Sequence, residues 1–461
     1  MLIDLVSKMK SGNRHLWWSI AAVAVPVAGQ MILQSLFGMA DVLMVAELGP
    51  VAVAAVGLAA KLHFLLIVLM AGIGAGCGIL VAQYSGAGDL ASGQKTLALS
   101  LFLGCLVMVP FTIAFAFFSD FLVALINPDP EVVKLASSFL RITAMVLLLT
   151  QIIVIYESAL RALGHTGLSL IAGVTSAAIN VLLNYVFIFG HWGFPAMGVE
   201  GAAWATLLSR TVQLGLILTR LYWCKHVFAL LKSHFIAAFD IPALLHFLKF
   251  VAPLVVNHLI WGIGNTTYHV LTGYAGTDAL AVMGMLVPIE SLFISIFVGL
   301  SSAAAVMIGR ALGAGDQQLA WQLHRLFDRF TLILVLFLSA ILWFSRPWIV
   351  NMFGELTPDM AQLLSNTLGV FALLIWLKMF NMIRVLGVLR AGGDNRFCLL
   401  TDTIGMWGIG IPLYSIAVFS GSYSFIVIYA LMYIEEFAKF LPIYKRLGVR
   451  KWMNNLTIAR S

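Results

Sequence analysis

Long apolar runs recur along the whole chain, and short polar segments separate them. A run of about 20 apolar residues is long enough to cross the hydrocarbon core of a bilayer as an α-helix. Such runs predict about twelve membrane-spanning helices in this chain. The predicted spans are 16–47, 51–85, 94–119, 134–162, 167–190, 199–223, 242–274, 277–312, 321–345, 360–390, 397–419 and 423–444.

The composition agrees with a chain embedded in lipid. Of its 461 residues, 61% are hydrophobic and only 10% are charged, and the mean hydropathy is +1.00. A water-soluble domain could not cover that much apolar surface with so few polar residues. No long polar stretch could fold as a separate soluble module, so we predict one all-α integral membrane protein.

Basic and acidic residues alternate between successive loops. By the positive-inside rule, both chain ends and the basic loops lie in the cytoplasm, which requires an even number of spans. The net charge of +7 follows from this topology and gives no reason to expect a nucleic-acid partner. The basic side carries Lys8, Lys10, Arg14, Lys95, Arg161, Lys225, Lys232, Arg310, Arg325, Arg329, Arg390, Arg396, Lys445, Arg446, Arg450 and Lys451. The opposite loops carry Glu47, Asp120, Asp129, Glu131, Glu200, Asp278, Glu355 and Asp359, with Lys134 and Arg346 as their few bases.

The chain contains an internal repeat. Pro26 recurs as Pro253, and the Gly-Ala-Gly-Asp segment at 86–89 recurs at 313–316, both at an offset of 227 residues. A six-span unit has therefore been duplicated, and because six is even both copies have the same orientation. Parallel repeats of this kind are typical of transporters that alternate access between two bundles. The predicted organisation is a six-helix lobe at 1–223, a cytoplasmic linker at 224–241 and a second six-helix lobe at 242–461.

Asp41 is the leading functional candidate, because an ionised carboxylate inside a span costs about 2.5–3.5 kcal/mol even on insertion scales. Gln34 lies about two helical turns earlier and can face the same cavity. Asn180 and Asn184 place two amides on one face of the fifth span, where they can bond to a protonated Asp41 or bind Na⁺ through oxygen. Low dielectric favours the neutral carboxyl group, which is the chemistry that a proton-coupled exporter requires. The alternative is a structural hydrogen-bond cluster between helices.

Other candidates lie along the cavity faces of both halves. Pro26 removes a backbone hydrogen bond inside the first span, so it either allows a bend that moves the Asp41 face or makes a static kink. Asn257 and His258 lie in the seventh span, and an unperturbed histidine has a pKa of about 6.5, which makes His258 the candidate for a second titrating group. Glu290 and Arg384 either face the cavity of the second half or form interhelical polar pairs.

A series of short segments, in order along nearly the whole chain, resembles the multidrug and toxic compound extrusion (MATE) family. The segments are Gln34-Ser-Leu-Phe-Gly-Met-Ala-Asp41, Leu48-Gly-Pro50, Gly86-Ala-Gly-Asp89, Leu160-Arg-Ala-Leu-Gly164, Asn180-Val-Leu-Leu-Asn184, Gly198-Val-Glu-Gly-Ala-Ala-Trp-Ala-Thr206 and Leu389-Arg-Ala-Gly-Gly-Asp394. The resemblance implies two six-helix lobes that form a V. It also implies export of lipophilic or cationic drugs and metabolites, coupled to inward flow of H⁺ or Na⁺.

The resemblance also implies site residues. The family's cation site in the amino-terminal lobe maps to Asp41, Asn180 and Thr206, with Asn184 where many members of one branch have Asp. Na⁺ binding is implied at Asp41 and Asn180. In the second half this sequence departs from other members, because Asn257 stands where Glu is common and the tenth span has no acidic residue.

We therefore predict a cation-coupled antiporter that exports lipophilic or cationic drugs and metabolites by alternating access, with H⁺ favoured over Na⁺. We expect a monomer in the plasma (inner) membrane that needs no cofactor. The alternative is a flippase for a lipid-linked precursor, for which a cationic cavity containing Arg384 and Lys378 would be the sign. An enzyme is disfavoured because the chain has no H-E-x-x-H and no G-x-S-x-G motif, and a channel is disfavoured by the two-half repeat.

Overall fold

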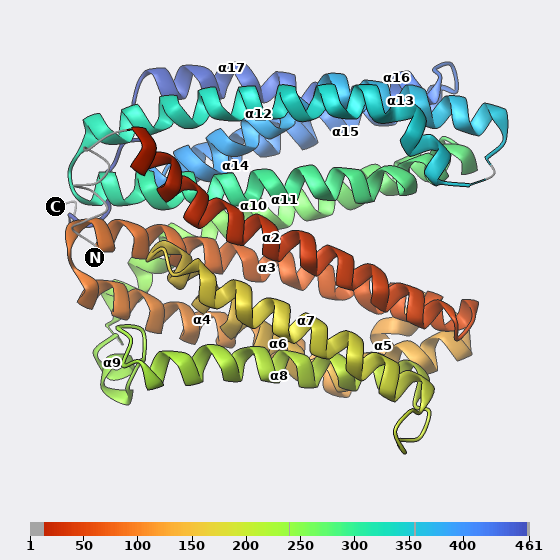
Figure 1. Cartoon of the computed structure of the whole chain (residues 1–461), viewed down its shortest axis with the longest axis horizontal. Coiled ribbons are helices and arrows are strands. Elements are labelled where there is room, and N and C mark those ends of the chain that lie inside the picture. The colour runs from red at the N-terminus through yellow and green to blue at the C-terminus, as the bar shows by residue number, and fades with distance from the viewer. Residues whose placement is uncertain (1–12, 239, 355, 459–461) are drawn as a thin grey trace. The chain divides into compact units, whose positions relative to one another are not determined.

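The computed structural model describes residues 13–238, 240–354 and 356–458. The predictions that concern Lys8, Lys10, Glu355 and the two chain ends lie outside these residues. The helices are α2 (Asn13–Ala46), α3 (Pro50–Ala87), α4 (Leu90–Phe117), α5 (Ser119–Ala124), α6 (Pro130–Ala162), α7 (Thr166–Phe189), α8 (Gly198–Trp223), α9 (Lys232–Ala238), α10 (Ile241–Tyr274), α11 (Thr277–Gly313), α12 (Gln317–Met352), α13 (Pro358–Met382), η1 (Ile383–Leu389), η2 (Arg390–Gly392), α14 (Asn395–Thr403), η3 (Ile404–Gly410), α15 (Ile411–Ser420), α16 (Phe425–Leu431) and α17 (Ile434–Gly448) (Figure 1).

The helices match the predicted spans closely. In the described part of the chain, 10 helices are long and apolar enough to cross a membrane. The two other predicted spans are also helical: 199–223 forms α8, and 423–444 forms α16 and α17, which are separated by Met432 and Tyr433. The prediction of an all-α membrane protein is confirmed.

The internal repeat extends to the geometry of the turns. Gly88 and Gly315 have φ angles of 78° and 77°, a left-handed conformation that glycine adopts without steric cost. The next residues, Asp89 and Asp316, each accept a hydrogen bond from the backbone N–H three residues later, at 3.0 and 2.9 Å. Both aspartates therefore cap the helix that follows.

One difference between the two copies lies in α13 and its continuation η1. The first residues of α6 and α13, Pro130 and Pro358, are 228 positions apart, whereas Leu160 and Leu389 are 229 apart. The last seven residues of this stretch, Ile383–Leu389, form the π-helix η1. A π-helical segment accommodates an extra residue within a continuous helix, which accounts for the added position.

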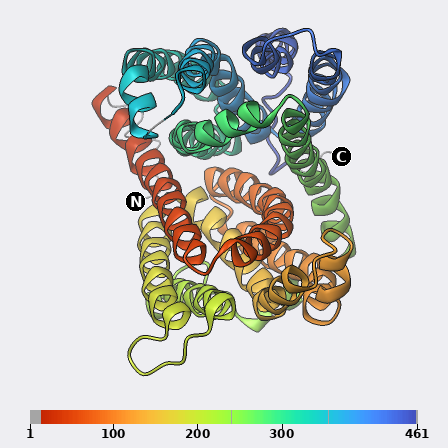
Figure 2. The same ribbon diagram turned by 90° about the vertical axis from the view of Figure 1, so that its right-hand side faces the viewer.

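The chain folds into two compact units whose boundaries fall inside helices. Unit 2 is Gly29–Val255, and unit 1 comprises the described residues up to Ala28 and from Val256 onward. The boundaries in α2 and α10 follow shortly after Pro26 and Pro253. Within each unit the long helices run in roughly the same direction (Figure 1), and Figure 2 views them nearly end-on.

Small residues bring the helices of unit 2 close together. Here α6 packs against α3, α4 and α8, and α7 packs against α8. A Cβ atom on Gly74 of α3 would lie 2.8 Å from Cγ1 of Val154 on α6, so this approach needs a glycine. A Cβ on Gly72 would lie 2.7 Å from Cα of Val255, which shows that the end of the first half of α10 packs directly on α3.

Unit 1 has a core of large apolar side chains. Phe297, Phe327 and Phe371 are fully buried in it. The first half of α2 belongs to this unit, because a Cβ on Gly299 of α11 would lie only 2.5 Å from the carbonyl oxygen of Ala24. Each unit therefore contains the first part of the helix that begins the other repeat.

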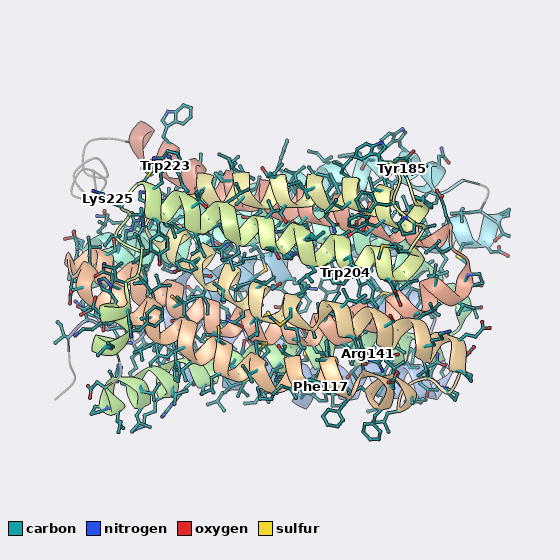
Figure 3. All side chains as sticks on the ribbon, turned by 90° about the horizontal axis from the view of Figure 1, so that it is seen from below. Phe117, Arg141, Tyr185, Trp204, Trp223 and Lys225 are labelled. Atoms are coloured by element: carbon teal, nitrogen blue, oxygen red, sulfur yellow. The ribbon has the colours of Figure 1, made fainter. Side chains whose placement is uncertain are left out.

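The outer surface of unit 2 is apolar, as expected for contact with lipid. Trp223 is 82% exposed and Phe117 is 76% exposed. Figure 3 shows Trp223 and Lys225 at one end of this unit and Tyr185 and Arg141 toward the other. Aromatic and basic side chains at helix ends fit the interfacial belts of a membrane protein.

Candidate functional site

Asp41 lies in unit 2, where two amides from α7 contact its carboxylate. Nδ2 of Asn184 donates a hydrogen bond to Oδ1 of Asp41 at 2.6 Å. With its amide nitrogen toward Asp41, Asn180 donates to both carboxylate oxygens at 3.0 Å; amide orientation is assigned from the hydrogen-bond network. The structure therefore brings these three predicted residues together.

A pocket of about 170 Å³ surrounds this carboxylate, between α2, α7 and α8. The candidate residues Gln34 and Thr206 line it, and Thr206 Oγ1 donates to the carbonyl of Ala202 at 2.9 Å. Pro26 does not line the pocket. It lies about two turns before Gln34 on α2. The lining residues are Gln34, Phe37, Gly38, Asp41, Gly173, Ser176, Ala177, Asn180, Thr206, Ser209 and Arg210.

The polar contacts of Asp41 are those of an ionised carboxylate, since both neighbouring amides donate to it. Oδ1 of Asn184 is buried and has no hydrogen-bond partner among the described residues. A protonated Asp41 needs an acceptor for its O–H group, and rotation of an amide would supply an oxygen at the same place. The two asparagines can thus satisfy Asp41 in either protonation state.

Arg210 also lines the pocket, and its guanidinium interacts electrostatically with Asp41. Na⁺ is bound through oxygen, so both asparagines would have to turn their amide oxygens toward such an ion.

Arg210 is not among the residues predicted from the sequence. Its Nη1 atom donates to Oε1 of Gln213 at 2.8 Å, and its charge acts on both Asp41 and Glu157. The available signal was an arginine inside the apolar run at 199–223, because an ionisable residue within a span marks a functional site by default.

Glu157 forms a second, fully paired polar cluster in the interior of unit 2. Nε2 of Gln30 and Nε2 of Gln213 donate to its Oε1 atom at 2.9 and 3.1 Å. Nη1 of Arg161 lies 3.9 Å from Oε2. Hydrogen bonds therefore connect Arg210 to Glu157 through Gln213, and an ion pair continues the line from Glu157 to Arg161.

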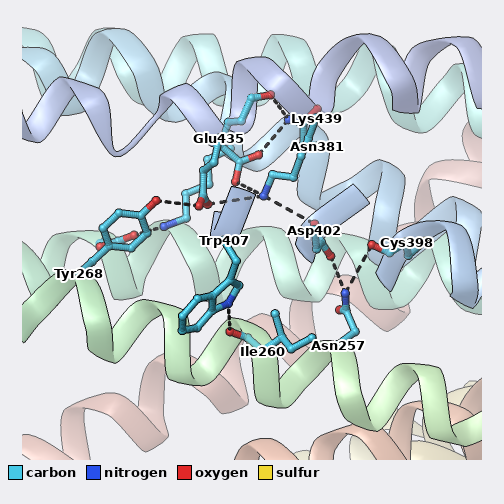
Figure 4. Close-up of polar contacts among 12 residues, drawn as sticks. Asn257, Ile260, Tyr268, Asn381, Cys398, Asp402, Trp407, Glu435 and Lys439 are labelled. Carbon is cyan, nitrogen blue, oxygen red and sulfur yellow. Dashed lines mark hydrogen bonds and ion pairs between the residues drawn. The ribbon is translucent and has the colours of Figure 1, made fainter. Parts of the chain in front are cut away.

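In unit 1, the predicted residue Asn257 joins an interior network (Figure 4), and the predicted residue His258 contacts another member of it. Nδ2 of Asn257 donates to Oδ2 of Asp402 at 2.9 Å, and Arg390 donates to Oδ1 of Asn257. Nε2 of His258 lies 3.5 Å from Nη1 of Arg390. These side chains connect α10 to α14 and the short helix η2.

The other two predicted residues of the second half form ion pairs. Glu290 pairs with Lys378, whose Nζ lies 2.5 Å from Oε1. Arg384 binds Asp328, with Nη2 at 2.8 Å from Oδ2, and its Cζ lies 3.9 Å from the ring centre of Phe380. Glu290 and Lys378 line a small cavity of about 30 Å³ in unit 1, and Arg384 is not among its lining residues.

The last helix adds a charged cluster that the sequence analysis also missed. Nζ of Lys439 lies 3.0 Å from Glu436, 3.5 Å from Glu435 and 3.6 Å from Asp402. Tyr268 donates to Oε2 of Glu435 at 3.0 Å (Figure 4). The signal was three charged residues within the final apolar run, at 423–444.

Asp41 differs from the other acidic residues inside the spans. Glu157, Glu290, Asp328, Asp402, Glu435 and Glu436 each lie within 4.0 Å of an amine or guanidinium nitrogen. Asp41 forms no such ion pair among the described residues, and its hydrogen bonds come from amides. Its charge can therefore change without leaving a basic partner unpaired in direct contact with it.

Comparison with known proteins gives consistent matches along the chain. The family model described as MatE matches residues 26–186 and 253–416. Among curated sequences, a probable multidrug resistance protein NorM of Thermotoga maritima is 26% identical over 402 residues, which cover 85% of this chain and 83% of that protein.

Two further comparisons concern a second relative and a solved fold. A probable multidrug resistance protein NorM of Rhizobium meliloti is 30% identical over 298 residues, or 64% of this chain and 63% of that protein. The crystal structure of MATE in the straight conformation superposes with a TM-score of 0.85 at 22% identity, and covers 94% of this chain and 96% of the other.

Proposed function

Because the chain belongs to the MATE family of multidrug efflux transporters, and is thus a multi-pass membrane transporter rather than an enzyme, we propose that it is a proton-coupled antiporter. In this proposal it exports lipophilic or cationic drugs and metabolites by alternating access. Protons that flow inward drive the export.

The observation that carries the proposal is the environment of Asp41. This carboxylate lines a pocket, forms no ion pair among the described residues, and is held by two amides that can donate or accept. Such a group can bind a proton from one side of the membrane and release it to the other. The paired carboxylates of both units would each have to break an ion pair to do the same.

The charge of Arg210 supports H⁺ over Na⁺ as the coupling ion. When Asp41 releases its proton, the nearby guanidinium stabilises the carboxylate that remains, so the pocket needs no metal cation for charge balance. Coupling would then involve Asp41, Asn180, Asn184 and Thr206.

The substrate class follows from competition for the same carboxylate. A cationic group of the substrate can occupy the pocket only when Asp41 is ionised, so substrate and proton exclude each other. A pocket of about 170 Å³ is smaller than a site that encloses a whole drug-sized molecule, typically about 300–1,000 Å³. It would hold the charged group, while apolar parts of the substrate lie outside it.

The flippase alternative depends on a cationic cavity in the second half. Arg384 and Lys378 are the residues that suggested one, and each is paired with an acid, Asp328 and Glu290. Neither provides a net positive charge for a lipid-linked precursor. This supports the exporter.

We propose the same topology and organisation for the membrane-embedded protein as the sequence predicts. Both termini lie in the cytoplasm, and the protein works as a monomer in the plasma membrane. The functional lobes are 1–223 and 242–461, joined by a cytoplasmic linker at 224–241.

The test uses purified protein in vesicles loaded with a fluorescent lipophilic cation. A proton gradient and a sodium gradient are imposed separately, and dye movement is recorded for wild type, Asp41→Asn and Asp278→Asn. Asp278 is an exposed acidic residue in the first turn of α11, so its variant removes the same charge outside the pocket. We expect the proton gradient alone to drive transport in wild type and Asp278→Asn, and Asp41→Asn to lose it.

Transport that responds only to sodium would overturn the choice of coupling ion. Normal proton-driven transport by Asp41→Asn would overturn the role of the carboxylate.

A further inference from the structure

A second, larger pocket lies in unit 1, at the beginning of α12. Its volume is about 560 Å³, and it is formed by the first turns of α12 and by the segment that follows α17. Its residues take no part in the network of Asn257 or in the pair of Glu290 and Lys378. The lining residues are Gln317, Gln318, Trp321, Gln322, Arg325, Arg450 and Met453.

The pocket is positively charged and has an aromatic wall. Arg325 and Arg450 are both exposed, and the lining contains no acidic residue. The Cζ atoms of Arg450 and Arg325 lie 4.3 and 5.7 Å from the ring centre of Trp321, within the range of cation–π contacts. In the described part of the chain, neither guanidinium lies within ion-pair distance of a carboxylate, so both charges are available to an anion.

The chain holds the wall that carries Arg450 in a defined conformation. Arg450 has a φ angle of 59°, which L-residues other than Asn and Asp rarely adopt. Two residues later Trp452 is fully buried. Its carbonyl oxygen packs directly on Gly392, where a Cβ atom would lie only 1.7 Å from it. Nδ2 of Asn455 donates to the carbonyl of Gly313 at 3.2 Å, which ties the segment to the end of α11.

The position of the pocket along α12 corresponds to the level of lipid headgroups. The uninterrupted apolar part of this helix begins near Phe330, and Arg325 lies about 7.5 Å before it at 1.5 Å per residue. The headgroup layer extends about 5–7.5 Å beyond the hydrocarbon core on each side. Arg325 therefore lies at the outer edge of the headgroup layer, and Trp321 lies one turn further out.

We propose that Trp321, Arg325 and Arg450 bind the phosphate group of an anionic phospholipid. Guanidinium groups form paired, charge-assisted hydrogen bonds with phosphate oxygens. The amides of Gln318 and Gln322 lie further out along α12 and can donate to hydroxyl oxygens of the headgroup. Basic pockets on the cytoplasmic side of membrane proteins bind anionic headgroups in this way. A soluble phosphate shares this chemistry, and the depth of the site favours the lipid.

The experiment measures lipid binding to the full-length purified protein by native mass spectrometry. Phosphatidylglycerol and phosphatidylcholine are titrated in detergent into wild type, Arg325→Gln/Arg450→Gln and Arg329→Gln/Arg396→Gln. The last variant removes two exposed arginines from α12 and α14 and changes the net charge equally. We expect wild type and this control to bind phosphatidylglycerol at least about tenfold more tightly than phosphatidylcholine, since each basic residue near the surface contributes about 1 kcal/mol.

The pocket variant should lose this preference, and Arg325→Lys/Arg450→Lys, which keeps the charge, should retain most of it. An unchanged preference in the glutamine pocket variant, or an equal loss in the control, would overturn the proposal. Displacement of phosphatidylglycerol by millimolar inorganic phosphate would overturn the lipid assignment in favour of a soluble phosphate. Unfolding of both pocket variants, seen as loss of the thermal transition, would mean that the arginines hold the fold together, which also contradicts the proposal.

Discussion

Arg210 sets the charge balance of the Asp41 pocket. It lines the pocket, donates to Gln213 and acts electrostatically on both Asp41 and Glu157. Glu157 has a second basic neighbour in Arg161, whereas Asp41 has none. The guanidinium therefore determines whether the pocket is neutral or negative when Asp41 is ionised.

We predict that Arg210→Gln makes transport sensitive to sodium. Without the guanidinium the ionised pocket carries a net negative charge, which favours Na⁺ binding through oxygen. Dye efflux from vesicles at constant pH, measured with and without 100 mM sodium, should change several-fold in this variant and stay constant in wild type. Arg220→Gln, at the exposed end of the same helix, is the control. A variant that ignores sodium would show that Arg210 does not select the ion.

The sequence predicts part of the pocket because membrane burial makes a few polar residues conspicuous. Asp41, Asn180 and Asn184 stand out within apolar runs, and the helical period predicts that the two asparagines share a face. Arg210 and the α17 cluster were as conspicuous but were not singled out. Their partners could not be predicted, because contacts such as that between Lys439 and Asp402 depend on how distant helices pack.

At the level of elements, Pro26 and Pro253 mark the places where α2 and α10 pass from one compact unit to the other. A proline inside a helix removes a hydrogen bond and clashes with the preceding turn, at a cost of about 3 kcal/mol. Both repeats keep a proline at the equivalent position despite this cost. We infer that a bend there serves both repeats.

We predict that Pro26→Ala stabilises the protein and slows transport. Restoring the hydrogen bond should raise the free energy of unfolding by about 1–3 kcal/mol, while a stiffer α2 should reduce dye efflux about tenfold or more if bending is part of the cycle. Pro347→Ala, inside α12 and away from a unit boundary, should raise stability without slowing efflux. Normal efflux by Pro26→Ala would mean that the kink is static.

The cap at Asp89 gives a pH prediction outside the spans. Hydrogen bonds from Ser92 lower the pKa of Asp89 below its ordinary value, so the folded state favours the ionised form. The contribution of ionised Asp89 to the free energy of unfolding is therefore complete above the unfolded-state pKa of about 4. It is lost as the pH falls through the lower pKa of the folded state. Asp89→Ala should cost about 1 kcal/mol at pH 7 and progressively less as the pH falls below about 4, as measured by thermal unfolding. A cost that does not depend on pH would contradict the cap.

The helix boundaries were predictable to within a few residues because lipid requires long apolar runs. The π-helical segments η1 and η3 and the break between α16 and α17 were not predictable. No glycine or proline marks the break at Met432 and Tyr433. The residues just after the break include buried Glu435 and Glu436, whose tertiary contacts local propensity does not report.

For the whole molecule, the duplication was evident in the sequence, but the exchange of helix halves between units was not. The repeat offset relates residues within one chain and gives no information on which helices pack together. Contacts such as Gly72 with Val255 and Gly299 with Ala24 require the three-dimensional structure. They place the first part of α10 in unit 2 and the first part of α2 in unit 1.

The central claim for the whole molecule is that one carboxylate exchanges a proton for a cationic substrate. Among the described residues, the other acids within the spans lie in ion pairs, and no second acid adjoins Asp41 because position 184 is asparagine. Binding of substrate and binding of a proton must then exclude each other. By linkage, each ligand lowers the affinity of the protein for the other by the same factor.

The most direct test measures protons released when substrate binds. Tetraphenylphosphonium is added to purified protein in weakly buffered detergent near neutral pH, and a pH indicator records the change. Wild type and Asp278→Asn should release up to about one proton per molecule, as expected for a single site under linkage, and Asp41→Asn, which has no carboxyl group to ionise, should release none. Equal release by Asp41→Asn, or none by wild type across the pH range from 5 to 8, would contradict the account.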